Sequence, residues 1–180
     1  PRAGISEIGR TYISGEYLSS RYTGGDFLVM NEFFVANNPD FSVESQFLPQ
    51  AGPADDLASL PAANIFCPKK ASSARYTVVC RIDGTNYSID AHYAFLSYTE
   101  EIYVSENNIF LTCHYQDRYT ENNANYRVSR TDISCLSYTD TLALEGTVTV
   151  NGSIKDQYSM DEKDGVLRVA TSLSETITPS

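Results

Sequence analysis

The two histidines, His92 and His114, are the side chains in this sequence best suited to acid–base or metal chemistry. A Ser–His–Asp or Cys–His site would need one of them as its base, and neither lies in a sequence that resembles a nucleophile elbow. Cys113 precedes His114 in a strand-like segment, so their side chains point to opposite faces and do not chelate one ion. We therefore expect both histidines to be structural or solvent-facing.

The sequence has four cysteines, which are widely spaced, and no two of them form a CxxC motif. This spacing argues against zinc-ribbon and thioredoxin-like sites. Three of them lie in strand-like segments, where a free cysteine behaves as a small hydrophobic residue. Three complete disulfide pairings are possible, and the sequence does not choose among them. The residues concerned are Cys67, Cys80, Cys113 and Cys135.

A cluster of carboxylates, Asp161, Glu162 and Asp164, precedes Gly165 and superficially suggests a calcium loop. It does not match the spacing of an EF-hand loop, so we expect a hairpin turn there, and we expect neither metal nor cofactor. Glycoside hydrolysis uses two carboxylates about 5–10 Å apart. That separation depends on the fold, which leaves a carboxylate-based enzyme open as an alternative.

Composition narrows the possible partners. The 180 residues carry a net charge of −10 and a pI near 4.5, which argues against binding to nucleic acid or to an anionic membrane surface. No apolar run approaches the roughly 20 residues of a membrane-spanning helix. The chain opens at Pro1-Arg2 without a methionine, so we expect a processed chain or a fragment.

Three windows of equal length repeat one pattern, at Ser14–Phe33, Leu96–Tyr115 and Ser153–Ser172. Each predicts two strands joined by a two-residue turn, whose residues tolerate the positive φ that such turns require. The turns are expected at Gly25-Asp26, Asn107-Asn108 and Asp164-Gly165. Apolar residues recur on alternate positions after each turn, which predicts a shared buried face.

The spacing of the repeats predicts an insertion. The second and third windows lie 57 residues apart, as do the strand-like segments Tyr76–Asp83 and Ile133–Asp140, whereas the first two windows lie 82 apart. The excess falls on Ala36–Ser73, which is rich in proline and polar residues. We predict that this segment is a long inserted loop.

Each repeat supplies four strands, and a tandem repeat of 50–60 residues of this kind predicts an all-β protein made of β-propeller blades. The second unit predicts the strands Ile102–Glu106, Ile109–Tyr115, Tyr126–Tyr138 and Leu142–Val150. In the first unit, Asn86–Phe95 takes the place of the fourth strand, and Ile5–Ile13 is expected to be the outer strand of a preceding unit. The rival all-β interpretation is a sandwich.

We count about two full blades with partial blades at each end, whereas propellers typically have about 4–8. Residues 1–180 are therefore expected to form a partial propeller domain. Either the remaining blades belong to the same full-length protein, or another copy completes the ring.

Four segments, GEYLSSRYTGGDFLV, YTVVCRID, EIYVSENNIFL and QYSMDEKDGVLRVATS, resemble a family of secreted bacterial β-propeller domains distantly related to WD40 repeats. The resemblance extends over essentially the whole chain. It implies a partial propeller domain that is secreted or anchored to the cell surface, and it implies no set of catalytic residues.

Function is expected on the connections between strands, because loops held by a rigid scaffold carry much of protein recognition. If strands alternate in direction, Tyr115–Asn125 shares one face with Ala36–Ser73, Leu96–Glu101 and Asn151–Gln157. Tyrosine and asparagine are adaptable contact residues, so Tyr115–Asn125 is the preferred binding loop. The candidate binding residues are Tyr115, Asp117, Arg118, Tyr119 and Asn122.

The leading hypothesis is a secreted or cell-surface module that binds an unidentified protein or glycan. The alternative is an extracellular hydrolase or lyase with a carboxylate-based site near the propeller axis. A third hypothesis is an extracellular spacer that has no ligand.

Overall fold

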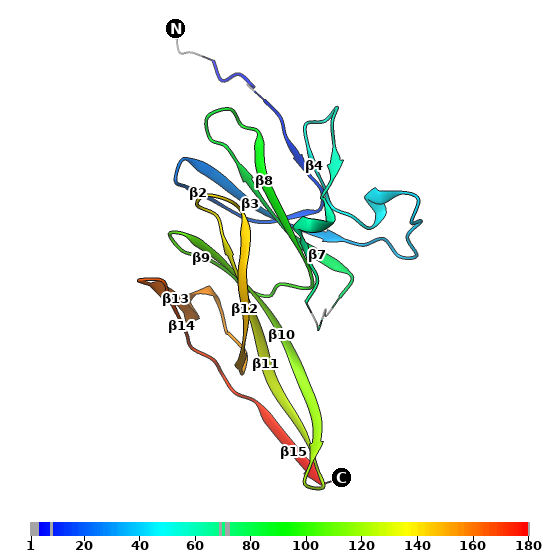
Figure 1. The fold of residues 1–180 in the computed structure, drawn as a ribbon, viewed down its shortest axis with the longest axis vertical. Coiled ribbons are helices and arrows are strands. Elements are labelled where there is room, and N and C mark those ends of the chain that lie inside the picture. The colour runs from blue at the N-terminus through cyan, green and yellow to red at the C-terminus, as the bar shows by residue number, and fades with distance from the viewer. Residues whose placement is uncertain (1–3, 8, 69, 71–72, 180) are drawn as a thin grey trace. The chain divides into compact units, whose positions relative to one another are not determined.

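The computed structural model describes residues 4–7, 9–68, 70 and 73–179, and the fold is all-β (Figure 1). Helical structure among these residues consists of three 3₁₀ turns, η1 (Glu44–Gln46), η2 (Ala62–Asn64) and η3 (Gln157–Ser159). None of the described helical segments is long and apolar enough to cross a membrane. The chain divides into two compact units, residues 1–97 and residues 98–180.

The first unit is built on an antiparallel sheet of four strands, which we call the first blade. Its central strand β7 is buried from Tyr76 to Arg81, as expected for a strand covered on both faces. β6 (Ile65–Phe66) adds to the outer edge of the sheet in parallel with β8. In sheet order, the blade consists of β2 (Glu16–Thr23), β3 (Asp26–Phe34), β7 (Arg75–Ile82) and β8 (Ile89–Leu96).

The segment predicted as a long inserted loop, residues 36–73, contains short strands as well as turns. Its strands are β4 (Gln50–Gly52), β5 (Ala58–Ser59) and β6, and its turns are η1 and η2. β4 pairs with β1 (Tyr12–Ile13), which is the part of the predicted Ile5–Ile13 strand that forms among the described residues. Ile8, Lys69, Ala71 and Ser72 lie outside the described residues.

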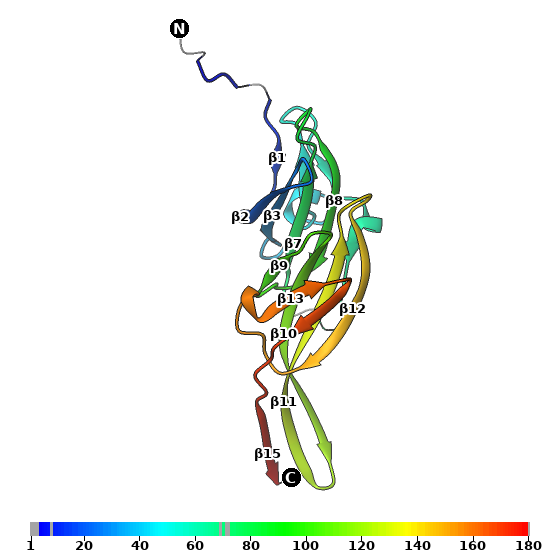
Figure 2. The same cartoon turned by 90° about the vertical axis from the view of Figure 1, so that its left-hand side faces the viewer.

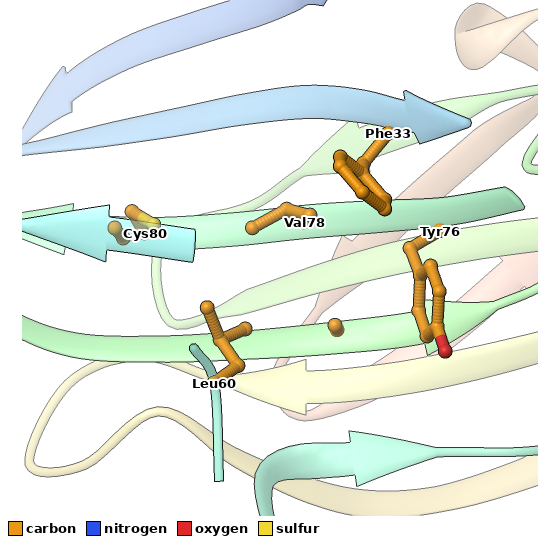
Figure 3. Close-up of a cluster of buried hydrophobic side chains, with 7 residues drawn as sticks. Phe33, Leu60, Tyr76, Val78 and Cys80 are labelled. Carbon is orange, nitrogen blue, oxygen red and sulfur yellow. The ribbon is translucent and has the colours of Figure 1, made fainter. Parts of the chain in front are cut away.

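The inserted segment contributes to the core of the first unit. Leu60 is only 2% exposed, and its side chain points toward the sheet that carries Val78 and Cys80 (Figure 3). Phe33 and Tyr76 pack in the same cluster, with their ring centroids 6.1 Å apart. The insertion is therefore folded onto the blade rather than being a solvated excursion.

The second unit contains the second blade and a third hairpin. The blade is antiparallel, and its outer pair contains a β-bulge at Cys135/Leu136. In sheet order, the blade consists of β12 (Ala143–Asn151), β11 (Ala124–Ser137), β10 (Asn108–Glu121) and β9 (Ile102–Val104). The third hairpin consists of β13 (Met160–Lys163) and β14 (Val166–Val169), and β15 (Glu175–Pro179) follows it.

The third hairpin packs against the second blade (Figure 2). Phe110 and Ile133 of the blade share a core cluster with Ile154 and Met160, and Leu167 of β14 packs against it. Burying apolar area of this kind contributes about 25 cal/mol per Å². The third hairpin and the second blade thus build one core within the second unit, from apolar positions that include Phe110 and Leu167 of the sequence windows.

Polar contacts fix the same hairpin. The Glu162 carboxylate accepts hydrogen bonds from the Ser105 hydroxyl and, at 2.8 Å, from Asn108 Nδ2. The Glu162 backbone N–H donates to the Tyr103 hydroxyl at 3.2 Å. Glu162, one of the three clustered carboxylates in which the sequence predicted a hairpin turn, therefore has a structural role.

Two of the three predicted turns are displaced by one residue. The first turn is Gly24-Gly25 rather than Gly25-Asp26, because Thr23 and Asp26 form the closing pair. The second is Glu106-Asn107 rather than Asn107-Asn108, since the Ser105 N–H donates to the Asn108 carbonyl at 2.9 Å. Both sequences offer adjacent turn-forming residues, so composition alone does not fix the register. The third turn, Asp164-Gly165, is confirmed.

The three hairpins belong to three separate sheets, and two of these sheets have the four-stranded antiparallel core of a propeller blade. A sandwich interpretation requires the windows to pair with one another, and the described strands do not do so. The predicted fold class, all-β with β-propeller blades, is confirmed.

Candidate binding arm

β10 and β11 form a hairpin that continues well beyond the rest of the second blade (Figure 1). β9 pairs with β10 only at residues 109–111, and β12 pairs with β11 only at residues 130–137. Between the pairs Gln116–Ser129 and Glu121–Ala124, β15 is the one described strand that pairs with the hairpin, and it does so with β11 at residues 124–128. We call residues 115–130 together with β15 the arm.

The arm corrects the prediction that Tyr115–Asn125 is a loop. Only Asn122 and Asn123 form the turn, with φ of 50° and 58°, and the other residues extend β10 and β11. Tyrosine and threonine favour strands, and Asn-Asn supports the positive φ of a primed turn. The abundance of polar side chains suggested a loop, but an exposed two-sided ribbon also requires polar side chains.

The structure divides the five candidate residues among three positions. Tyr115, Asp117 and Tyr119 alternate along β10 and share one face of the arm, which we call the carboxylate face. Arg118 lies on the opposite face, which we call the arginine face, and Asn122 lies in the turn. The strand register therefore does not bring all five candidate residues to one surface.

The carboxylate face is held by internal contacts. Arg130 Nε lies 3.7 Å from Asp117 Oδ2, and the Arg130 guanidinium also donates to Asn151. Asp132 Oδ1 accepts hydrogen bonds from the Tyr115 hydroxyl at 3.3 Å and from the Thr149 hydroxyl at 2.6 Å. The charges of this face are thus largely used within the protein.

Tyr119 and Tyr126 are cross-strand partners, and their rings stack with centroids 4.9 Å apart and planes inclined by 5°. Such aromatic pairs contribute about 0.5–1.5 kcal/mol beyond area burial. Tyr119 remains 39% exposed. The pair therefore stiffens the arm and still offers an aromatic surface to a ligand.

A groove of about 510 Å³ lies on the arm. Most of its lining comes from the arginine face, and the two stacked tyrosines also contribute. It is lined by Arg118, Tyr119, Thr120, Asn125, Tyr126, Arg127, Thr176 and Thr178. The sequence interpretation identified only Arg118 and Tyr119 of this set.

Counting the strand register outward from the turn would have identified two more of the residues that line the groove. Residues equidistant from the Asn122-Asn123 turn face each other, so Arg118 implies Arg127, and Tyr119 implies Tyr126. The contribution of Thr176 and Thr178 depends on the pairing of β15 with β11, a long-range contact that leaves no local signal.

The histidines lie outside the arm groove. Burial lowers the pKa of His92 in β8 below its ordinary value of 6.5. His114 Nδ1 lies 3.9 Å from Glu100 Oε1, and its Nε2 is buried without a hydrogen-bond partner among the described atoms. Among the described residues, no group of three or more His, Cys, Asp or Glu side chains is arranged to hold a metal ion.

The four cysteines are free thiols. Burial raises the pKa of Cys80 to about 12. Burial also raises the pKa of Cys135 to about 11, with smaller contributions from the carboxylates of Glu162 and Glu145. A thiol with a raised pKa is a poor nucleophile, so both of these residues serve packing.

The other two carboxylates of the cluster, Asp161 and Asp164, lie in the third hairpin, as the predicted turn requires. Asp161 pairs with Arg168 across the third hairpin, and Asp164 takes the positive-φ turn position with φ of 54°. Asp161 and Glu162 are thus held in structural contacts, and Asp164 is a turn residue.

Among the comparisons with known proteins, only the one with protein-family models gives a match. Neither a curated protein nor a solved structure matches it. The family model of the β-propeller domain matches residues 2–179, which is nearly the entire chain. With its repeated hairpins and four-stranded antiparallel sheets, the chain belongs to the β-propeller domain family.

Proposed function

We propose that this propeller domain is a secreted or cell-surface binding module and that the arm is its recognition element for a protein or a glycan. The observation that carries the proposal is the continuation of β10 and β11 beyond β9 and β12, where their side chains are mostly exposed. A strand extension that buries little apolar area adds little to the core, so its length and composition call for another role.

The composition of the arm fits recognition. Tyr119 and Tyr126 provide rigid aromatic surface, while asparagine, threonine and arginine provide hydrogen bonds that suit polar ligands. A location outside the cell is supported by the resemblance to secreted propellers. A propeller scaffold by itself is compatible with many functions, so the assignment depends on the arm.

Excision of the arm tests the proposal. Tyr115 and Arg130 are cross-strand partners, so an Asn-Gly turn joining them in place of residues 116–129 closes a shorter hairpin in the same register. We expect a ligand found by screening glycans and extracellular proteins against the full chain to lose its binding to this variant.

The matched control keeps the arm and changes only its turn, from Asn122-Asn123 to Asn-Gly. This control should bind as the parent does, and thermal unfolding followed by circular dichroism checks that both variants fold. Undiminished ligand binding by the folded excision variant would contradict the proposal. A complete absence of ligands in the screen would favour the spacer hypothesis instead.

A further inference from the structure

The arginine face contrasts with the overall charge of the protein. The chain has 23 acidic and 13 basic residues, yet the register places no carboxylate on this face of the arm among the described residues. The side chains on it are those of Gln116, Arg118, Thr120, Asn125, Arg127, Ser129, Thr176 and Thr178. The carboxylates Asp117, Glu121 and Glu175 all fall on the opposite face.

Arg118 and Arg127 stand directly opposite each other in the β10–β11 register. Like charges at opposed positions destabilise an antiparallel pair. Both side chains are exposed, and neither makes a hydrogen bond or ion pair within the described part of the chain. Folding therefore gains nothing from this arrangement, in contrast to Arg130, which is paired with Asp117.

The surroundings of the two arginines provide further ligand-binding groups. Thr120, Thr176 and Thr178 provide hydroxyls, and Asn125 provides an amide along the same groove. The Thr120 hydroxyl donates to Asn125 Oδ1 at 2.8 Å, which holds the Asn125 amide group in place. Tyr119 and Tyr126 also border the groove, but the register places their side chains on the opposite, carboxylate face. Charged, hydroxyl and amide groups thus occur together on the arginine face.

We propose that this groove binds an anionic polysaccharide through its carboxylate or sulfate groups, a proposal that rests on the arm being the recognition element. Guanidinium groups bind planar oxyanions through paired N–H donors. The threonine and asparagine side chains match sugar hydroxyls. The paired arginines place two positive charges side by side, which suits a chain that carries repeated anionic groups.

The geometry favours a polysaccharide over an acidic peptide. Extended peptides bind sheets chiefly by adding a strand at an edge, where backbone hydrogen bonds and side-chain pockets hold them. The groove lies instead on a sheet face whose side chains are polar. The net charge of −10 opposes polyanions at long range, but the Debye length of about 8 Å at physiological salt leaves short-range arginine contacts dominant.

Calorimetric titration of the full chain with oligogalacturonate and with dextran sulfate tests the proposal and separates carboxylate from sulfate. Methyl-esterified oligogalacturonate and dextran are the matched neutral ligands. We expect binding of at least one anionic ligand, which its neutral counterpart does not reproduce. Arg118→Gln or Arg127→Gln alone should weaken that binding about tenfold, equivalent to about 1.4 kcal/mol, and the double variant about a hundredfold.

Arg130→Gln is the matched control, because it removes the same charge from the same arm on the opposite face. It should leave affinity within about twofold, well below the tenfold change that corresponds to about 1.4 kcal/mol. Arg118 and Arg127 are exposed and repel each other, so their replacement should not lower the unfolding temperature. The unfolding temperature therefore shows whether a variant binds more weakly because it has lost contacts with the ligand or because it no longer folds.

The proposal is overturned if no anionic polysaccharide binds, if the double variant binds as well as the parent, or if poly-glutamate binds while both polysaccharides do not. A protein or neutral glycan whose binding requires the arm but not the two arginines would overturn the anionic inference and leave the proposed function standing. Anionic polysaccharide binding that persists after arm excision would overturn both.

Discussion

The first and second blades use the same repeat in opposite ways. Both join their second and third strands at the same point of the unit, but the first does so through residues 35–74 and the second through Asn122-Asn123 at the end of extended strands. In the first blade the connection folds back and buries Leu60. In the second, the strands run outward as the arm and remain largely exposed.

This difference separates stabilisation from recognition. The inserted segment supplies buried apolar residues and a parallel strand, β6, so changes there should lower the free energy of unfolding. The arm supplies exposed polar and aromatic side chains, so changes there should affect ligand binding more than folding. The first two predictions below each test one side of this contrast.

The largest effect is expected for Leu60→Ala in the inserted segment. Leu60 is 2% exposed and belongs to the core cluster of the first unit, and truncation of a buried leucine costs about 2–5 kcal/mol. We expect a loss in this range, measured by urea unfolding. Leu57→Ala in the same segment is the control, because Leu57 is 43% exposed, and it should change the unfolding free energy by less than about 0.5 kcal/mol. Equal effects would mean that the inserted segment does not stabilise the blade through its buried side chain.

A smaller effect is expected for Tyr126→Leu in the arm. Loss of the stack with Tyr119 removes about 0.5–1.5 kcal/mol, and it should do so locally, because few apolar contacts link the arm to the core. We expect faster amide hydrogen exchange in residues 115–130 and little change in the exchange of β7. A double-mutant cycle with Tyr119→Leu isolates the stacking energy. Additive effects of the two substitutions would show that the rings do not stabilise each other.

The sequence predicts more of the scaffold than of the binding surface. The repeat of Leu28, Phe110 and Leu167 after three turns indicated the hairpins, because apolar residues at fixed spacing report a buried face directly. The arm was less predictable, since an exposed ribbon and a polar loop have similar compositions. Arg127 follows from the Asn122-Asn123 turn only once the strand register is known.

Other features depend on long-range contacts. The pairing of β15 with β11 places Thr176 and Thr178 beside the arginines, and Leu60 becomes a core residue only because the inserted segment folds back. Neither the residue type nor the local pattern reports these contacts. The composition of residues 36–73 predicts an insertion but does not show which leucine is buried.

The smallest expected effect is the contribution of His92, which is half-buried in the first blade, to the pH dependence of the unfolding free energy. Burial lowers the pKa of this imidazole below 6.5, so the folded protein binds its proton less readily than the unfolded chain does. His92 therefore contributes stability that is complete above pH 6.5 and declines as the pH falls through the lowered pKa.

The pH range in which His92 affects stability can be distinguished from the range in which the carboxylates do. Hydrogen bonds from Ser42 lower the pKa of Asp40, and backbone N–H donors of Thr85 and Asn86 lower that of Asp83, so both lose their contribution only as the pH falls below 3.8. We expect His92→Gln to flatten the decline in unfolding free energy just below pH 6.5 and to leave the more acidic decline intact. Titration of the His92 ring protons by NMR gives the pKa directly. A midpoint at or above 6.5 would show that β8 leaves this side chain solvated, and would assign any decline in that window to other groups.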